Sequence, residues 1–502
     1  MEITPSVFRR ILLLAAAVVG HQAAAATYHV DAGAGDDTRS GASPDQAWKS
    51  LEKVNATVLQ PGDQVLFKAG QTWTGQLKPR GPGKLPDAQV ALTRIGRYGE
   101  GPAPRIDGNG VPLDTVLVEN IECLEVADLE VTNQGATTMP WRTGVKVSAR
   151  EFGPMRRIYL RRLFVHDVNG DLRKSQEGCG IYFEAKGRGG PLFDGLLVED
   201  CHVVRTDRNG ICQRGTGRTR SRNVIIRNNL LEDIGGDGIK LWGTDGGLIE
   251  RNVVRGARAR CTSGEAAAGI WPFACDDTVV QFNEVSDTKG TTDGEGYDSD
   301  YYCRRTLIQY NYSFHNEGGF LLVCSPGSAY NEGTVVRYNL SVEDGTPQGR
   351  VFHFGGGASD THVYNNTIIL GARQQLPLMV FGEWDKGLPR NTRFTNNLFL
   401  VAEGGRARYQ FGPSQGHVFE NNLFVGKHEG LPPGTIITAT EPPFSGPLEP
   451  KPGLKSLAAF KPRSGADWPR GRLIDKSGGR DFFGTPVPKD RGPTLGCAEA
   501  GR

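Results

Sequence analysis

The chain has 502 residues and a formal net charge of +2, with no basic stripe and no acidic tail. That balance argues against a nucleic-acid partner. Its nine cysteines have no metal-type spacing, so they do not indicate a zinc site. Three pairings stay open as disulfides or simple contacts, namely Cys179 with Cys201, Cys261 with Cys275, and Cys303 with Cys324.

The first residues have the features of a secretory signal. Arg9 and Arg10 precede an apolar run, residues 11–20, that is too short to cross a bilayer. An A-x-A cleavage site follows within residues 23–26. We therefore expect residues 1–26 to be a cleaved signal peptide and the mature chain to be periplasmic or secreted, with no later membrane span.

Residues 27–64 are expected to form an N-terminal cap. Within residues 47–56, Trp48, Leu51 and Val54 lie at a spacing that places them on one helical face. A short amphipathic helix here would cover the open end of a repeat structure.

A short phrase of β-formers, polar residues and Asn recurs along the next part of the chain. Its anchor residues are Asn229, Asn252, Asn283, Asn311, Asn339, Asn366, Asn397 and Asn422, which are 23 to 31 residues apart. Short strands repeating at this period indicate a solenoid. We predict an all-β, right-handed parallel β-helix over residues 65–425. The Asn residues would stack at a turn, where Asn tolerates left-handed backbone and can bond the amides of its neighbours along the stack.

A second pattern, Gly-apolar-x-apolar-x, recurs after the Asn phrase. Strand side chains alternate between faces, so the residue after Gly points inward and the next one outward. The outward positions counted this way are Tyr182, Glu184, Cys212, Arg214, Lys240, Trp242, Trp271, Phe273, Asp298, Asp300, Leu321 and Val323. Exposed aromatic and charged residues in one strip favour a sugar-binding groove over a plain sheet face covered by loops.

The segment 292–301 has four carboxylates within eight residues. Asp298 and Asp300 lie at i and i+2 on the same outward face, which suits the acid and base of a glycosidase. Glu295 and Glu317 are expected to assist them. A Ca²⁺ site made by Asp298, Asp300 and Glu295, or an acidic turn without a ligand, are the alternatives.

Other candidates lie beside this cluster. Asp237 is expected at the edge of the groove, although it also suits a turn, and His315 is expected to approach the acidic cluster from the neighbouring coil. His353, Glu383 and Trp384 belong to later coils and would form the far wall of a cleft.

The repeat stops near residue 426. Prolines become frequent after that point, so we expect residues 426–502 to be an irregular tail that packs on the solenoid. The segment 480–484 is its expected docking point.

Three short stretches resemble the recurrent ends of secreted parallel β-helix repeat proteins of the pectate-lyase-like superfamily. They are Trp48-Lys49-Ser50-Leu51, Gln60-Pro61-Gly62-Asp63 and Gly479-Arg480-Asp481-Phe482-Phe483-Gly484. The resemblance implies the fold and a secreted polysaccharide hydrolase, lyase, esterase or noncatalytic surface protein. Residues 236–240 resemble the acidic strand of polygalacturonase-type hydrolases, but the partner motifs of that family are absent.

The leading hypothesis is a secreted glycoside hydrolase acting on a plant or microbial polysaccharide. It would be a monomer and need no cofactor. Asp298 and Asp300 would carry the chemistry, assisted by Glu295 or Glu317. The substrate would contact Lys240, Trp242, Trp271, Arg214, Tyr182, Glu184, Asp237 and His315.

Two alternatives remain. One is a Ca²⁺-dependent polysaccharide lyase acting on a uronate-containing chain, with Lys240 or Arg304 as the base. The other is a noncatalytic carbohydrate-binding surface protein.

Overall fold

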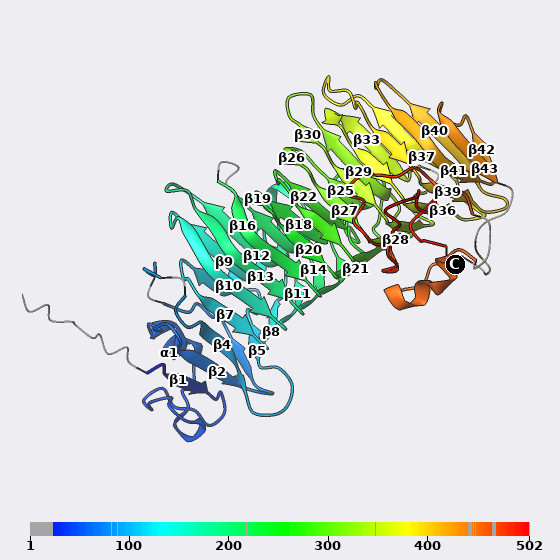
Figure 1. The fold of residues 1–502 in the computed structure, drawn as a ribbon. Coiled ribbons are helices and arrows are strands. Elements are labelled where there is room, and N and C mark those ends of the chain that lie inside the picture. Colours follow the sequence, from blue (N-terminus) through cyan, green and yellow to red (C-terminus); the bar gives the residue numbers. More distant parts are fainter. Residues whose placement is uncertain are drawn as a thin grey trace, which may run out of the picture.

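The chain folds into a right-handed parallel β-helix, as the repeat predicts. The computed structural model describes residues 24–500 except 82, 88, 216–218, 263, 347, 440–443, 445, 447 and 464–467. The predicted signal peptide lies almost wholly outside these residues. Figure 1 shows the coils stacked in chain order, from the N-terminal end near α1 (Leu51–Ala56) to the C-terminal strands between β40 (Arg406–Phe411) and β43 (Thr435–Ala439).

The coils share two long sheets and one short one. A 28-stranded sheet and a 12-stranded sheet run the length of the solenoid, and their strands pair in parallel with strands of neighbouring coils. The 12-stranded sheet consists, in chain order, of β6 (Asp114–Glu119), β9 (Thr143–Arg150), β12 (Cys179–Lys186), β15 (Asn209–Arg214), β18 (Ile239–Trp242), β22 (Ile270–Phe273), β25 (Glu295–Ser299), β29 (Gly319–Ser325), β33 (Phe352–Gly356), β37 (Gln375–Gly382), β40 (Arg406–Phe411) and β42 (His428–Glu429).

The predicted Asn residues form one continuous ladder. Asn283 donates from Nδ2 to Asn311 Oδ1 at 3.0 Å, and Asn311 donates to Asn339 Oδ1 at 3.0 Å. Both are completely buried. The left-handed backbone at this turn belongs to the preceding residue, for example Tyr310 with φ 57°. The expected left-handed backbone at the ladder Asn was therefore wrong. The hydrogen bonds of its side chain hold the ladder Asn in place, and its φ is not the reason for Asn at this position.

The interior of the solenoid is a single apolar column of Val, Ile, Leu and Phe side chains. Inward positions of the 12-stranded sheet contribute to it, as predicted from alternation. In β25, Tyr297 points inward, and its hydroxyl donates to the carbonyl oxygens of Asn283 and Tyr312, both at 3.0 Å. Its neighbour Asp298 therefore faces outward.

The N-terminal end carries the expected helix in shorter form. α1 spans Leu51–Ala56, and the Ser50 side chain accepts a hydrogen bond from Lys53 N as its N-cap. Trp48, Leu51 and Val54 are all buried against the core, although Trp48 precedes the helix. Strand β1 (Thr27–Val30) already pairs with β2 (Gln64–Lys68), so the first coil includes part of the predicted cap.

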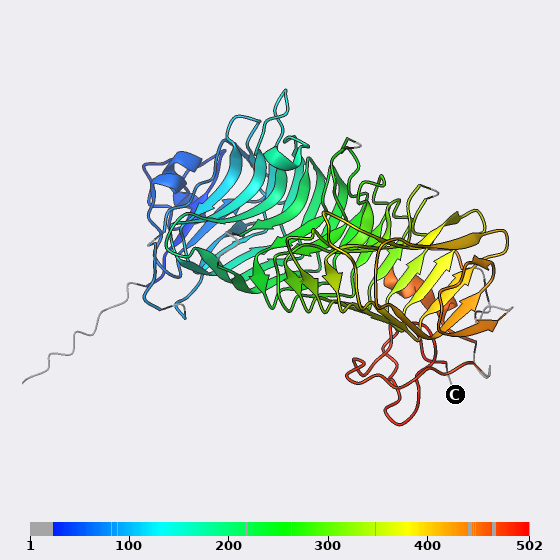
Figure 2. The same ribbon diagram turned by 90° about the horizontal axis from the view of Figure 1, so that it is seen from above.

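At the other end, the parallel sheet continues beyond residue 425. Strand β43 (Thr435–Ala439) pairs with β41 (Val418–Val425). The tail then lies along the side of the later coils (Figure 2). Phe482, within the predicted docking segment, is buried in a cluster with Tyr312 and Leu340 of the solenoid.

The nine cysteines are all free thiols, so none of the three open pairings is a disulfide. In the part of the chain that the structure describes, no helix has the length and apolarity needed to cross a bilayer.

Candidate functional site

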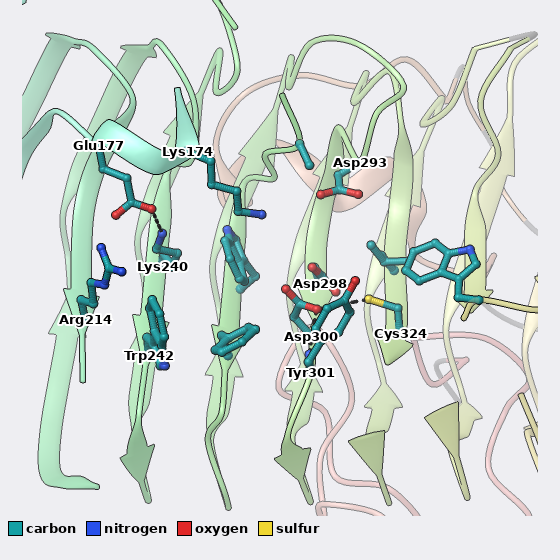
Figure 3. A pocket seen from close by; sticks show the side chains of 15 residues that line it. Lys174, Glu177, Arg214, Lys240, Trp242, Asp293, Asp298, Asp300, Tyr301 and Cys324 are labelled. Atoms are coloured by element: carbon teal, nitrogen blue, oxygen red, sulfur yellow. Dashed lines mark hydrogen bonds and ion pairs between the residues drawn. The ribbon is translucent and has the colours of Figure 1, made fainter. Parts of the chain in front are cut away.

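A cavity of about 420 Å³ opens on the outer face of the 12-stranded sheet (Figure 3). Its floor is made by outward side chains of five successive strands, β15, β18, β22, β25 and β29. Loops at the strand ends supply its rim. We call it the carboxylate cavity; it is lined by Lys174, Glu177, Arg214, Lys240, Trp242, Ala266, Trp271, Phe273, Asp293, Asp298, Asp300, Tyr301, Leu322, Cys324 and Trp384.

Asp298, Asp300 and Cys324 meet at one side of this cavity. One carboxylate oxygen of each Asp and the Cys324 Sγ lie within 4.8 Å of one another. Asp300 Oδ1 accepts hydrogen bonds from Tyr301 N at 2.7 Å and from Cys324 Sγ at 3.4 Å. Asp298 is only 3% exposed, and its Oδ1 is buried without a hydrogen-bond partner. The Asp298–Asp300 pair therefore has one buried oxygen, Asp298 Oδ1, that lacks a hydrogen bond and lies beside the open cavity.

Burial and mutual repulsion raise the pKa of these carboxyls. Burial, followed by the charges of Asp300 and Asp293, raises the pKa of Asp298 well above its usual value. Burial also raises the pKa of Asp300 to about 6, although the Lys174 ammonium opposes the shift. Two buried carboxyls this close resist being ionised together, because their charges would repel each other away from water.

Asp293 faces this pair from the loop before β25. In Figure 3 its carboxylate points toward Asp298 and Asp300 across the cavity, while Lys174 extends toward the same space. Burial raises the pKa of Asp293, and the Lys174 charge works against that shift. The cavity thus holds carboxyl groups on two sides and the Lys174 ammonium beside them.

Two buried ion pairs support the floor. Lys240 Nζ lies 2.5 Å from Glu177 Oε1, and both side chains are almost completely buried. Burial disfavours the Lys240 charge, but the nearby Cys212, Glu177 and Asp237 raise its pKa overall. Lys240 is therefore a fixed cation.

The second ion pair, Arg208 with Asp237 at 3.1 Å, has no exposed side-chain surface. Asp237 also accepts a hydrogen bond from Trp271 Nε1 at 3.0 Å. Burial would raise the pKa of Asp237, but the charges of Arg208 and Lys240 outweigh it and lower that pKa. Asp237 therefore stays ionised and fixes the orientation of the indole.

The aromatic side chains form the wall between the carboxyls and Arg214. Trp242 packs edge-on against Phe273, with ring centroids 5.0 Å apart. Arg214 lies over the Trp242 ring at 5.1 Å. The Trp242 Nε1 is buried and has no hydrogen-bond partner. Flat apolar rings beside unsatisfied donors suit the faces and hydroxyls of a sugar.

Six of the twelve sequence-predicted site residues line this cavity, namely Asp298, Asp300, Lys240, Trp242, Trp271 and Arg214. Asp237 is completely buried behind Trp271 and does not line the carboxylate cavity. Tyr182 and Glu184 line a neighbouring cavity, which also includes Arg214.

The remaining three predicted residues lie elsewhere. Glu295 is buried against Arg350 at 2.6 Å, and burial raises its pKa to about 7. Glu317 accepts a hydrogen bond from Gly290 N, and His315 pairs with Glu343 at 3.2 Å. None of the three is among the residues that line the carboxylate cavity.

The predicted outward pair Leu321 and Val323 was wrong. Both point into the core, because β29 pairs Glu295 with Gly319 and Asp298 with Leu322. Counting alternation from Gly319 is therefore one residue out of register, and a slip of one residue reverses every side chain. Leu322 and Cys324 face the cavity instead.

Sequence reasoning also missed Lys174, Glu177 and Asp293 as lining residues. Lys174 begins a short 3₁₀ helix, Lys174–Gln176, in the connection before β12, and Glu177 follows it. No periodic pattern reaches these loops. Asp293 was inside the acidic segment that the sequence singled out, and only the turn geometry places it opposite the pair. His353 and Trp384 do meet, with ring centroids 5.0 Å apart, and Trp384 forms the far wall.

The donor set does not fit calcium. Ca²⁺ takes about six to eight oxygen ligands, whereas the cluster offers two carboxylates and a thiol. The proposed lyase bases fit no better. Lys240 is held as a buried cation by Glu177, and Arg304 lies outside the cavity, stacked on Tyr330 at 3.9 Å and paired with Glu332 at 3.0 Å.

Comparison with known proteins gives the same fold. The family model described as "Right handed beta helix region" matches residues 179–368. A lacto-N-biosidase from Bifidobacterium longum subsp. longum is 29% identical over 80% of the chain; the chain spans about 30% of that relative's length.

Among solved structures, a GH136 lacto-N-biosidase from Eubacterium ramulus is 26% identical, with a TM-score of 0.61 over 82% of this chain and 68% of that one. XylC in complex with xylose, at 12% identity and a TM-score of 0.54 over 94% of this chain and 98% of that one, shares the fold alone. The chain thus has a right-handed β-helix region and is similar over most of its length to GH136 lacto-N-biosidases.

Proposed function

We propose that the protein is a glycoside hydrolase and that the carboxylate cavity is its active site. The observation that carries the proposal is the set of buried carboxyls with raised pKa values on two sides of an aromatic-lined cavity. The similarity to lacto-N-biosidases supports it. A hydrolase needs one protonated and one ionised carboxyl around the glycosidic bond.

The geometry favours a division of roles. Asp298 lies in β25 and Asp300 directly follows the last residue of that strand, and one oxygen of each lies within 4.8 Å of the other. The catalytic carboxyls of glycosidases are about 5–5.5 Å apart in retaining enzymes and about 6.5–9.5 Å apart in inverting ones. We therefore assign Asp300, whose pKa burial raises to about 6, as the proton donor. Asp298 is the neighbouring carboxyl, which burial and its acidic neighbours keep protonated, and Asp293 is the facing nucleophile or base. This replaces the predicted Asp298–Asp300 pair with Asp300 and Asp293.

The substrate would be an oligosaccharide or a polysaccharide chain end. Trp271 and Trp242 would stack on sugar rings, and Trp242 Nε1 would donate to a hydroxyl. We include a glycan of the kind for which lacto-N-biosidases are named as the first substrate to test. Export to the periplasm or medium and a monomeric state are further parts of the proposal, and the apolar N-terminal run supports export.

The test is digestion of a panel of neutral and uronate-containing oligosaccharides, including a glycan of the kind for which lacto-N-biosidases are named. Products are followed by new reducing ends and by the absorbance of unsaturated uronate. Hydrolysis gives reducing ends without that absorbance, is unaffected by EDTA, and disappears in Asp300→Asn. Unsaturated uronate together with inhibition by EDTA would establish the lyase alternative. Glycan binding without any cleavage across the panel would favour the noncatalytic one.

A further inference from the structure

A second cavity, of about 790 Å³, lies on the same outer face of the 12-stranded sheet. It covers β9, β12 and β15, toward the N-terminal end from the carboxylate cavity. Arg214 lines both, so the two cavities are neighbours in one groove. Strands are ~4.8 Å apart, so the four steps from β25 to β12 amount to about 19 Å. A glycan chain cleaved at β25 can therefore reach the second cavity.

The second cavity, which we call the cationic cavity, carries an excess of positive charge. Four cations line it, Lys146, Arg150, Lys186 and Arg214, against a single carboxylate, Glu184. Glu184 already serves two of them, Lys186 at 2.7 Å and Lys146 at 3.6 Å. Within the described residues, neither the Arg150 nor the Arg214 guanidinium forms an ion pair.

Like charges also stand directly opposite one another there. Lys186 of β12 pairs in register with Arg150 of β9. Such a pair destabilises a sheet unless a counter-charge lies between the two residues. Glu184 bonds Lys186 and leaves Arg150 unmatched.

The aromatic residues of this cavity are placed for a sugar ring. Trp141 and Trp242 hold the Arg214 guanidinium between them, at 5.7 and 5.1 Å. Trp141 has a left-handed backbone, φ 64°, which is rare for a bulky residue and persists where the surrounding structure imposes it. Tyr182 is 3% exposed, and its hydroxyl has no hydrogen-bond partner. A ligand bearing acceptor oxygens would satisfy it.

We propose that the cationic cavity binds an anionic sugar unit, carrying a carboxylate or a sulfate, in the same glycan that is cleaved in the carboxylate cavity. The inference rests on the proposed function in assuming that this glycan is cleaved. Arg150 and Arg214 would pair with the anionic group, since guanidinium forms bidentate bonds with such oxygens. Trp141 and Tyr182 would contact the ring. The protein would thus select acidic oligosaccharides at a distance from the bond it breaks.

Binding is measured by calorimetry on matched oligosaccharides that are neutral, uronate-bearing or sulfated, and long enough to reach from β25 to β12. The wild type is expected to bind the acidic members about tenfold or more tightly, with a preference that weakens in salt. Arg150→Gln and Arg214→Gln should each remove most of that preference. Arg188→Gln, which removes an exposed charge in the loop after β12 without lining the cavity, should keep it.

Equal binding of neutral and acidic members by the wild type would overturn the proposal. An equal loss in Arg188→Gln would also overturn it, because the preference would then reflect the general field of the surface. Thermal unfolding checks that each variant is folded. Every protein in these titrations, the one with the wild-type cationic cavity included, also carries Asp300→Asn, so binding is read without turnover. Absence of hydrolysis by the unsubstituted chain on every substrate would contradict the proposed function while leaving this measurement valid.

Discussion

The Asn ladder and the carboxylate cavity are both rows of buried polar side chains that cross successive coils, and they differ in how those side chains are satisfied. In the ladder each amide donates to the next Asn and to a backbone carbonyl, as Asn311 does to Asn339 Oδ1 and Val280 O. In the cavity the carboxyls repel one another, and Asp298 Oδ1 has no partner. A polar row that completes its own hydrogen bonds is architecture, whereas one that leaves them incomplete is prepared for a ligand.

The largest expected effect tests the cavity side of this comparison. Asp293→Asn and Asp300→Asn should each lower kcat by roughly 10²–10⁴-fold, since each removes a carboxyl from the proposed acid–base chemistry. Their melting temperatures should be unchanged or higher, because repulsion among buried carboxyls is relieved. Steady-state kinetics with differential scanning calorimetry measure both. Asp360→Asn, an exposed aspartate, is the control, and a similar loss there would contradict the assignment.

A substitution in the Asn ladder should instead lower stability and leave kcat unchanged. Asn311→Ala removes the side-chain bonds to Asn339 and Val280 and those accepted from Asn283. Leaving those buried groups unpaired should cost roughly 2–4 kcal/mol of unfolding free energy in urea titrations. The surviving folded enzyme should keep its kcat. Gln410→Ala, an exposed amide on β40, should stay within about 0.5 kcal/mol of the wild type.

A third expectation concerns pH. An unfolded Asp titrates near pH 3.9, whereas burial raises the folded-state pKa of Asp300 to about 6. Between these values the folded protein holds protons that the unfolded chain has released, so its stability should fall as pH rises from about 4 to about 7. Activity should fall on the alkaline side as the acid loses its proton. Asp300→Asn should flatten the stability curve in this window; an unchanged curve would contradict the raised pKa.

The same contrast explains how far the sequence could lead. The eight ladder Asn residues recur every 23 to 31 residues within the same short phrase, so their stacking was predictable from the repeat. Alternation from Gly238, Gly269 and Gly296 placed Lys240, Trp271 and Asp298 on the cavity floor. It failed at Gly319, where the register shifts by one residue.

The rim was not predictable. Lys174 and Asp293 come from connections of irregular length, and their positions depend on how those loops fold over the sheet. Asp293 has a left-handed backbone, φ 56°, and an Asp at such a turn has no distinguishing sequence pattern.

The smallest expected effect is at Trp271. Its indole nitrogen has a hydrogen-bond partner, as the ladder amides do, while its ring lines the carboxylate cavity. Its Nε1 donates to the buried Asp237, while its ring lines the cavity with Lys174 and Lys240 each 5.4 Å from the centroid. Trp271→Phe keeps an aromatic face but loses the bond that orients it, so KM should rise roughly three- to tenfold, about 1 kcal/mol, with kcat nearly constant. Phe273→Leu, which removes a neighbouring ring without a polar anchor, is the matched variant. If Trp271→Phe instead lowers kcat a hundredfold at constant KM, the indole acts on the reacting bond, and the floor cannot be treated as a passive platform for the carboxyls.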